Sequence, residues 1–220
     1  MEIRPFDDIV AILASFVIAV SIHEFMHAWT AHRLGDDTAR DEGRITLNPV
    51  SHFEPFGFIG MVLIALGFPF IGWGKPVPVS PGQFRGTWAR RRQQGMLLVA
   101  AAGPLSNVAQ AFLVALPYQY AIRNGIDMGE LGDVLWWFIR INILLAAFNM
   151  IPIPPLDGHK ILMGLLPAFW YPMFAALERY GFMILILLLF IGGRAGGSII
   201  GGMIDPVEDA LLRIVFFTLT

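Results

Sequence analysis

Residues 9–31 read IVAILASFVIAVSIHEFMHAWTA, and this stretch decides which kind of protein the chain forms. A helix needs about 20 apolar residues to cross a hydrocarbon core about 30 Å thick, and the stretch is long enough. It nevertheless carries three ionisable side chains within five residues, His23, Glu24 and His27. Each such side chain at the centre of a span costs about 2.5–3.5 kcal/mol on insertion scales. We therefore expect a spanning helix whose polar groups share a compensating partner.

The composition also indicates a membrane protein. Hydrophobic residues make up 56% of the 220 residues and charged residues 15%, against about 45–50% and 25% in soluble domains. The formal net charge of −2 argues against binding of nucleic acid or another polyanion. The chain has no cysteine, which excludes disulfides and cysteine-ligated metals. A metal ion in this protein would need histidine and carboxylate ligands.

Further apolar stretches predict an all-α polytopic membrane protein. Three spanning helices form its expected core, and additional C-terminal helices follow. The length allows one domain, so we expect residues 1–220 to form a single transmembrane domain with a core at about 9–165 and C-terminal helices at about 170–219. The expected core spans are residues 9–31, 96–121 and 134–153, and the later helices are residues 174–191 and 207–219.

The interval between the first two spans predicts a small membrane-surface β element and a re-entrant segment. Residues 44–47 alternate like a short strand, and residues 75–79 carry proline at alternate positions, which suits only an edge strand. Residues 57–73 are apolar but short, and Gly60, Gly67 and Pro69 interrupt them. We expect this segment to enter and leave the bilayer on one side.

The charges predict the orientation of the chain. Arginine and lysine are concentrated in residues 33–92, whereas residues 123–133 are mainly acidic, so the positive-inside rule places residues 33–92 in the cytoplasm. At 1.5 Å per helical residue, Glu24 lies about 22 Å along a core of about 30 Å. We therefore expect a multi-pass protein of the prokaryotic plasma membrane, with its site nearer the cytoplasmic side.

The His-Glu-x-x-His pattern at residues 23–27 predicts a metal site. At about 100° per helical residue, His23 and His27 lie one turn apart on nearly the same face, so both imidazoles can reach one ion. Glu24 projects beside that site, where it can take a proton from a water molecule that attacks a carbonyl group. The residues therefore predict a metal-dependent hydrolase.

Asp157 is the best candidate for a third ligand, because catalytic zinc typically has three protein ligands and one open position. It follows the proline-rich sequence of residues 152–156 at the inner end of the third span, where the helix breaks and a carboxylate can turn back. The alternative is that Asp157 and Gly158 form a turn in which the aspartate caps the next helix.

Taken together, these motifs resemble the site-2 protease family of intramembrane zinc metalloproteases. The resemblance rests on HEFMH at 23–27, GPLSN at 103–107, NMIP at 149–152 and LDG at 156–158, with GKPVP at 74–78. Their order on three successive spans matches the family core and covers residues 9 to about 165. Many family members carry PDZ or CBS domains, and the resemblance here is to a compact member without them.

The resemblance implies that His23, His27 and Asp157 bind one zinc ion and that Glu24 is the general base. It also implies that Asn149 helps to stabilise the oxyanion, although an asparagine near a helix end also commonly satisfies loose backbone groups. The implied activity is regulated intramembrane proteolysis of transmembrane substrates. Because the chain has little room for a recognition domain, a regulatory or adaptor membrane protein is a possible further partner.

Two other polar residues are candidates for the surroundings of the site. Asn107 follows Pro104 by three residues and either bonds the carbonyls that the proline frees or orients a metal ligand. His52 lies in a loop that approaches the metal if residues 57–73 are re-entrant, and could then act on the substrate as an electrophile or transient ligand.

Two rival functions remain at this point. A non-proteolytic zinc-binding membrane scaffold or carrier would bind the metal without needing Glu24 beside the first ligand. A membrane metalloprotease of the prenyl-protein-processing kind would also use His-Glu-x-x-His, but takes a downstream glutamate as third ligand. The best downstream carboxylate in this chain is Asp157.

Overall fold

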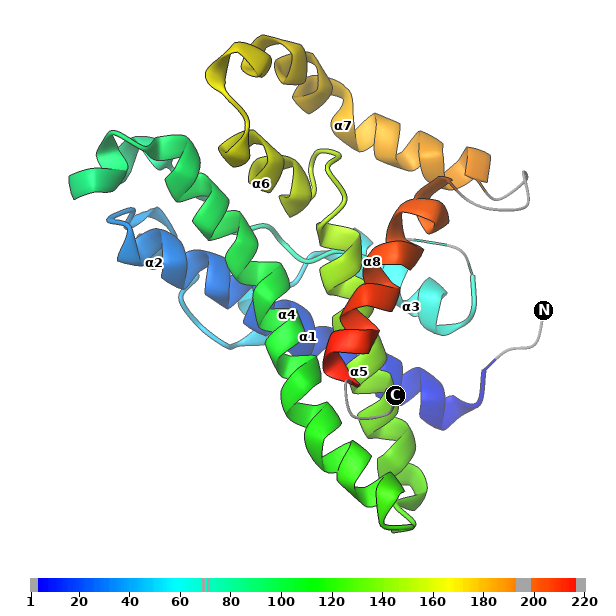
Figure 1. Ribbon diagram of the computed structural model, residues 1–220. Helices are drawn as coiled ribbons and strands as arrows, with labels where there is room; N and C mark the ends of the chain where they lie inside the picture. Colours follow the sequence, from blue (N-terminus) through cyan, green and yellow to red (C-terminus); the bar gives the residue numbers. More distant parts are fainter. Residues whose placement is uncertain (1–3, 69, 71, 193–198, 217–220) are drawn as a thin grey trace.

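The computed structural model describes residues 4–68, 70, 72–192 and 199–216, and helices dominate it (Figure 1). Among the described residues, three helices are long and apolar enough to cross a membrane, which confirms the predicted three-helix core. They are α1 (Phe6–Arg33), α4 (Arg92–Arg123) and α5 (Gly129–Asn149). The remaining elements are α2 (Thr38–Asp41), η1 (Pro49–His52), α3 (Pro55–Ala65), η2 (Pro81–Gln83), η3 (Gly86–Ala89), α6 (Asp157–Leu165), η4 (Ala168–Trp170), α7 (Tyr171–Gly192) and α8 (Ile199–Val215).

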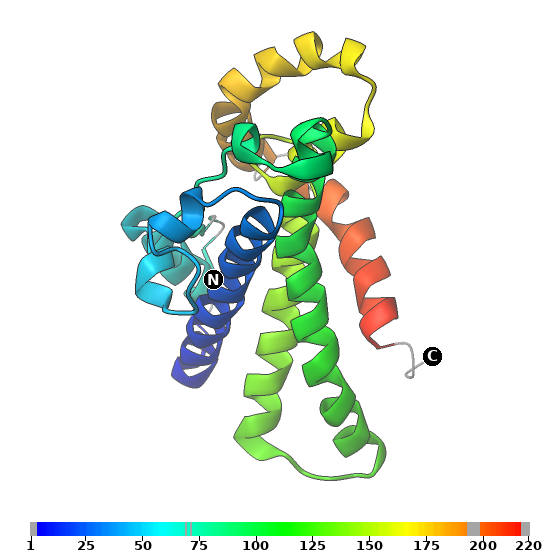
Figure 2. The same cartoon turned by 90° about the vertical axis from the view of Figure 1, so that its left-hand side faces the viewer.

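The core is a bundle in which α1, α4 and α5 all contact one another. Figure 2 shows α4 and α5 side by side, with α1 on one side of the pair, α8 on the other, and α7 at the end away from the α4–α5 connection. Small side chains line these contacts and let the helix backbones approach closely. Fully buried alanines at the contacts are Ala19 and Ala28 of α1, Ala111 and Ala115 of α4, and Ala146 and Ala147 of α5.

The C-terminal end of α1 is fixed by a glycine. Gly35 has φ +102°, which favours glycine, and a Cβ added there would lie 2.9 Å from the backbone nitrogen of Arg85. That close approach lets Arg85 N–H donate to the carbonyl of Leu34 at 2.9 Å. The loop before α4 is thereby attached to the end of the helix that carries His23 and His27.

The predicted β element is wrong for the described part of the chain, where residues 44–47 form a bend and residues 75–79 an extended segment without a strand partner. The physical reason lies in the amides of residues 75–79. Pro76 and Pro78 have no N–H, Lys75 N–H donates to His52 O, and Val77 N–H donates to the carboxylate of Glu24. Two of the three remaining donors are therefore used on α1 and η1 rather than on a neighbouring strand.

The predicted apolar segment at residues 57–73 contains the short helix α3 rather than a full span. Its two ends lie side by side, because Lys75 N–H donates to His52 O at 2.9 Å and Gly57 is in close contact with the carbonyl of Trp73. A Cβ at Gly57 would lie 2.0 Å from that oxygen, so the approach requires glycine. The chain thus reverses between residues 57 and 73.

Two prolines lie inside the second span without interrupting it. Helix α4 continues through Pro104 and Pro117. Ser106 follows Pro104 and donates to the carbonyl of Gly103 at 2.7 Å, which satisfies one backbone group near the proline. Gly103 and Asn107 of the GPLSN motif therefore lie on one continuous helix and both face α1.

The C-terminal part of the chain is helical, as predicted, but with different boundaries. The expected helix at 174–191 lies within α7, and the segments Ala168–Phe174 and Leu177–Leu188 form a bent pair that gives a fourth candidate span. The helix expected at 207–219 begins earlier, at Ile199, as α8. Residues 217–219 of that expected helix lie outside the described residues.

Candidate metal centre

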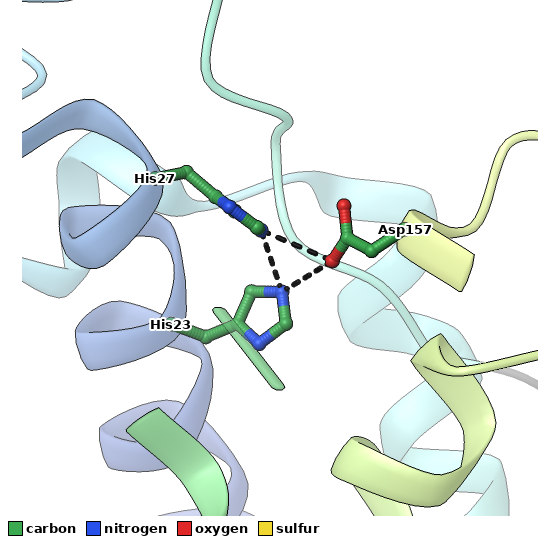
Figure 3. A group of neighbouring side chains, drawn as sticks. All are labelled: His23, His27 and Asp157. Atoms are coloured by element: carbon green, nitrogen blue, oxygen red, sulfur yellow. Dashed lines mark hydrogen bonds and ion pairs between the residues drawn. The ribbon is translucent and has the colours of Figure 1, made fainter. Parts of the chain in front are cut away.

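Three side chains from two helices converge on one point in the bundle. His23 and His27 project from α1, and Asp157 projects toward them from the N-terminus of α6 (Figure 3). The two Nε2 atoms are 2.9 Å apart, and each lies 3.1 Å from Oδ2 of Asp157. All three residues are buried. Residues that are far apart in the sequence therefore present three ligand atoms to one small volume.

The turn after α5 brings Asp157 to the histidines. Helix α5 ends at Asn149, and Leu156 is extended before Asp157 begins α6. A Cβ at Gly158 would lie 2.2 Å from the carbonyl oxygen of Met150, so this tight return of the chain requires glycine. The carboxylate of Asp157 is directed toward the histidines, and no side chain forms a cap hydrogen bond at the start of α6.

The Nδ1 atoms of both histidines, which face away from Asp157, have fixed hydrogen-bond partners. His27 Nδ1 lies 2.7 Å from the carbonyl oxygen of Val99, which can only accept, so this nitrogen carries the proton. His23 Nδ1 lies 2.6 Å from Oδ1 of Asn107. With both protons on Nδ1, both Nε2 lone pairs point to the shared volume, which is the arrangement that metal-ligating histidines adopt.

The shared volume fits a cation. Two imidazole lone pairs and a carboxylate oxygen are all acceptors, so a positive ion between them removes their mutual repulsion. Gly103 of α4 faces this volume, and a Cβ there would lie 2.5 Å from Nε2 of His23 and of His27. Two histidines and one carboxylate are a common ligand set of catalytic zinc sites, which keep a fourth position open.

Glu24 lies beside these residues at the wall of a cavity of about 310 Å³. The same cavity is lined by His23, His27 and Asp157. Oε2 of Glu24 accepts a hydrogen bond of 3.0 Å from Val77 N–H. A carboxylate is therefore held next to the three converging ligand atoms, on the edge of a space that a substrate can enter.

The structure places the other predicted residues at different distances from this cavity. Asn149 lines it, and its Nδ2 donates to Leu145 O at 3.0 Å within its own helix. Asn107 is fully buried and contacts His23. His52 donates from Nε2 to Thr46 O at 2.9 Å and lines a neighbouring cavity, so the structure does not bring it to the metal ligands.

Three further features of the site did not emerge from the sequence as functional. Gly103 was recognisable only as part of the GPLSN motif, although its missing side chain opens the metal volume. Val77 was recognisable only as the residue between two prolines, and it provides the one amide donor of residues 76–78. Asn142 gave one signal, an amide side chain in the middle of an apolar span, and it contacts Asn107.

Comparisons with known proteins agree with this arrangement. A model of "Peptidase family M50" matches residues 117–192. The Bacillus subtilis protein named "Putative zinc metalloprotease YwhC" is 35% identical over 92% of this chain and 90% of its own length. "Putative zinc metalloprotease Rip2" of Mycobacterium tuberculosis strain H37Rv is 30% identical over 87% of this chain and 71% of its own length.

No solved structure matches the chain. The similarity to YwhC nevertheless extends over nearly the full length of both proteins. The chain belongs to peptidase family M50, the site-2 protease family of metalloproteases.

Proposed function

We propose that the chain is an intramembrane protease that hydrolyses peptide bonds in or near transmembrane segments of membrane proteins. The observation that carries this proposal is the position of the site. The residues of the three converging ligand atoms and Glu24 line one cavity, and apolar residues of the long helices also line it. These apolar residues are Phe16 and Val20 of α1, Val99 and Ala100 of α4, and Leu145 and Phe148 of α5.

In this proposal His23, His27 and Asp157 hold one zinc ion per chain. The ion, when bound, supplies a Lewis acid that polarises the scissile carbonyl group and lowers the pKa of water. Glu24 takes the proton from the attacking water and returns it to the leaving amine. Its hydrogen bond from Val77 N–H holds the carboxylate at the cavity while leaving its second oxygen for that proton.

Asn149 is proposed to stabilise the oxyanion. Its side-chain nitrogen carries two N–H groups, and one is used on Leu145 O within α5. The other remains for a carbonyl oxygen that acquires negative charge in the cavity. An uncharged amide suits this role because it adds no charge to a membrane-embedded site.

The general base argues against the alternative of a non-proteolytic zinc scaffold or carrier. Such a protein needs ligands for the metal but no carboxylate next to them. Here Glu24 lies in the cavity wall, and a backbone amide from residues 72–79 fixes its direction. Hydrolysis uses such a group, whereas simple retention of the ion does not.

We further propose that residues 57–73 enter the bilayer from the cytoplasmic side and return to it. This proposal is supported by the short apolar helix α3 and by the contact between the two ends of the segment. We place the protein in the prokaryotic plasma membrane, with the cavity open toward the cytoplasm. Residues 72–79 would bind the substrate in an extended conformation next to the cavity. Either a transmembrane substrate alone or one presented by an adaptor membrane protein fits this geometry.

Single cysteines test that topology, because the chain has none of its own. Val50, which precedes the segment in the sequence, and Gly82, which follows it, are both exposed. Cysteines at both positions should react with an impermeant reagent from the cytoplasmic face of sealed vesicles. Labelling of the two positions from opposite faces rules out the re-entrant segment.

The proteolytic function is tested with the purified full chain in detergent or vesicles. Wild-type protein loaded with zinc should cleave a model membrane protein with one transmembrane segment. Glu24→Gln should bind about one zinc per chain but cleave about 10²- to 10⁴-fold more slowly, the usual contribution of general acid–base catalysis. Wild-type activity in Glu24→Gln would remove the base assignment, and an inactive zinc-loaded wild type would favour the scaffold.

A further inference from the structure

Two buried asparagine side chains connect His23 to helix α5. Asn107 of α4 has its Oδ1 2.6 Å from His23 Nδ1, and its Nδ2 donates to Oδ1 of Asn142 at 2.9 Å. Asn142 belongs to α5, and its own Nδ2 donates to Phe138 O at 3.0 Å. Both asparagine side chains are completely buried. The chain of contacts thus joins all three core helices at the depth of the first metal ligand.

Backbone carbonyls determine the direction of every hydrogen bond that connects Asn142, Asn107 and His23. Phe138 O can only accept, so the amide nitrogen of Asn142 faces it and the oxygen of Asn142 faces Asn107. Asn107 must then present its nitrogen to Asn142. Ala19 O, which also can only accept, lies 3.3 Å from the same nitrogen. The oxygen of Asn107 is left facing His23.

The orientation of Asn107 determines which nitrogen of His23 holds the proton. An oxygen facing Nδ1 requires a proton on Nδ1 and leaves the Nε2 lone pair free toward Asp157 and His27. If the Asn107 amide were reversed, its nitrogen would face Nδ1, and the proton of neutral His23 would lie on Nε2 inside the metal volume. That tautomer cannot serve as a ligand through Nε2.

The two histidines differ in what fixes them. His27 donates directly to a backbone carbonyl, Val99 O, which has no alternative orientation. His23 relies on a side-chain amide, which can be reversed with almost no change in shape. Only His23 therefore needs a second residue that prevents the reversal.

We propose that Asn142 is a positioning residue of the metal site, which holds the Asn107 amide in the orientation that keeps the Nε2 lone pair of His23 available. This inference rests on the proposed ligand role of His23, but not on the identity of the substrate. Residues that act on a metal ligand in this indirect way typically change metal affinity by 10- to 100-fold when they are replaced.

The alternative is a purely structural role, in which Asn142 only connects α4 and α5 by a hydrogen bond, as polar side chains commonly do within membranes. Gln119 provides a matched control, because it is a buried amide of α4 whose Nε2 donates to Val215 O, away from the metal site. Asn142→Leu and Gln119→Leu each remove a buried interhelical amide of this kind. Only the first should affect the metal.

The experiment measures zinc affinity by competition with a chelator in the solubilised full chain, without substrate, for wild type, Asn142→Leu, Asn142→Asp and Gln119→Leu. Asn142→Leu should bind zinc about 10- to 100-fold more weakly. Asn142→Asp should recover affinity to within about threefold of wild type, because a carboxyl group keeps an oxygen for Asn107 in either protonation state. The visible spectrum of bound Co²⁺ should change in Asn142→Leu alone.

Wild-type zinc affinity in Asn142→Leu would overturn the inference, as would an equal loss in Asn142→Leu and Gln119→Leu. Failure of Asn142→Asp to recover affinity, with its helical content and thermal stability retained, would also contradict it. These outcomes are distinct from failure of the proposed function. If wild-type protein binds zinc and cleaves nothing, the role of Asn142 in metal binding still stands.

Discussion

The interior of the three-helix core and the extended segment at residues 72–79 hold the two parts of the candidate site in different ways. In the core, His23 and His27 are bonded to groups on α4. Beside the cavity, Glu24 is bonded to one amide of a segment that has no strand partner among the described residues. The helical core therefore holds the candidate metal ligands, whereas the direction of Glu24 depends on a segment outside that core.

The largest expected effect on zinc binding concerns the helical core. Gly103→Ala places a Cβ 2.5 Å from both histidine Nε2 atoms, so the ligands must separate. We expect zinc affinity, measured by chelator competition, to fall at least about 100-fold, which is the upper end of indirect effects on metal ligands. Gly202→Ala in α8 is the control, since a Cβ there meets nothing within 4 Å.

Both substitutions replace a helical glycine with alanine and should favour the helix by up to about 1 kcal/mol each. A difference in zinc affinity therefore reports the space at the metal and not helix formation. Unchanged affinity in Gly103→Ala would mean that the ligands do not meet at the face of α4.

At the boundary between the two regions, where Asn149 ends α5, we expect an effect on turnover alone and none on zinc affinity. Asn149→Ala should keep wild-type zinc affinity and lower kcat about 10²- to 10³-fold, as expected for one oxyanion donor. Asn124→Ala is matched to it, because Asn124 makes the same bond to a carbonyl four residues earlier near the end of α4. Loss of zinc from Asn149→Ala, or an equal decrease in kcat for both variants, contradicts the oxyanion role.

The smallest effect concerns the loop after α1. The hydrogen bond from His32, followed by the nearby charges of Arg40 and Arg85, lowers the pKa of the half-buried Asp37 carboxyl group. A carboxyl group with a lowered folded-state pKa stabilises the fold above its ordinary pKa, about 3.9, and loses that contribution as pH falls through the lowered value.

Amides of α2 should therefore exchange hydrogen with solvent faster at pH 3 than the intrinsic pH dependence of exchange explains. Asp37→Asn should remove this additional pH dependence and leave amides near Asn142 unchanged. Asp41→Asn is the control, because Asp41 ends the short helix that Asp37 precedes and is more exposed than Asp37. Identical pH dependence in wild type and Asp37→Asn would show that the His32 contact does not stabilise the loop.

The sequence predicted those parts of the site that depend on local spacing. His23 and His27 are one helical turn apart, and the apolar stretch around them requires a compensating partner, so the spanning helix and the metal site could be predicted together. Asp157 was reachable because zinc needs a third ligand and prolines end α5 before it. The family resemblance pointed to the same three residues.

Features that depend on distant partners could not be predicted in this way. The alternation at 44–47 and the prolines at 75–79 resembled strands, but Val77 N–H is used by Glu24, which is 53 residues away in the sequence. Asn142 lies 35 residues from Asn107, and nothing local identifies that contact. Pro104 lies inside α4 without ending it, which the local sequence alone does not reveal.

The position of the cut in a transmembrane substrate shows directly whether the protein hydrolyses peptide bonds within the membrane. Zinc-loaded wild-type protein would be incubated in vesicles with a substrate that has one apolar segment and soluble flanks, and the products identified by mass spectrometry. We predict a cut within the apolar segment or at its cytoplasmic boundary, absent from Glu24→Gln. Cuts confined to the soluble flanks, far from the membrane, would contradict the account of an intramembrane protease.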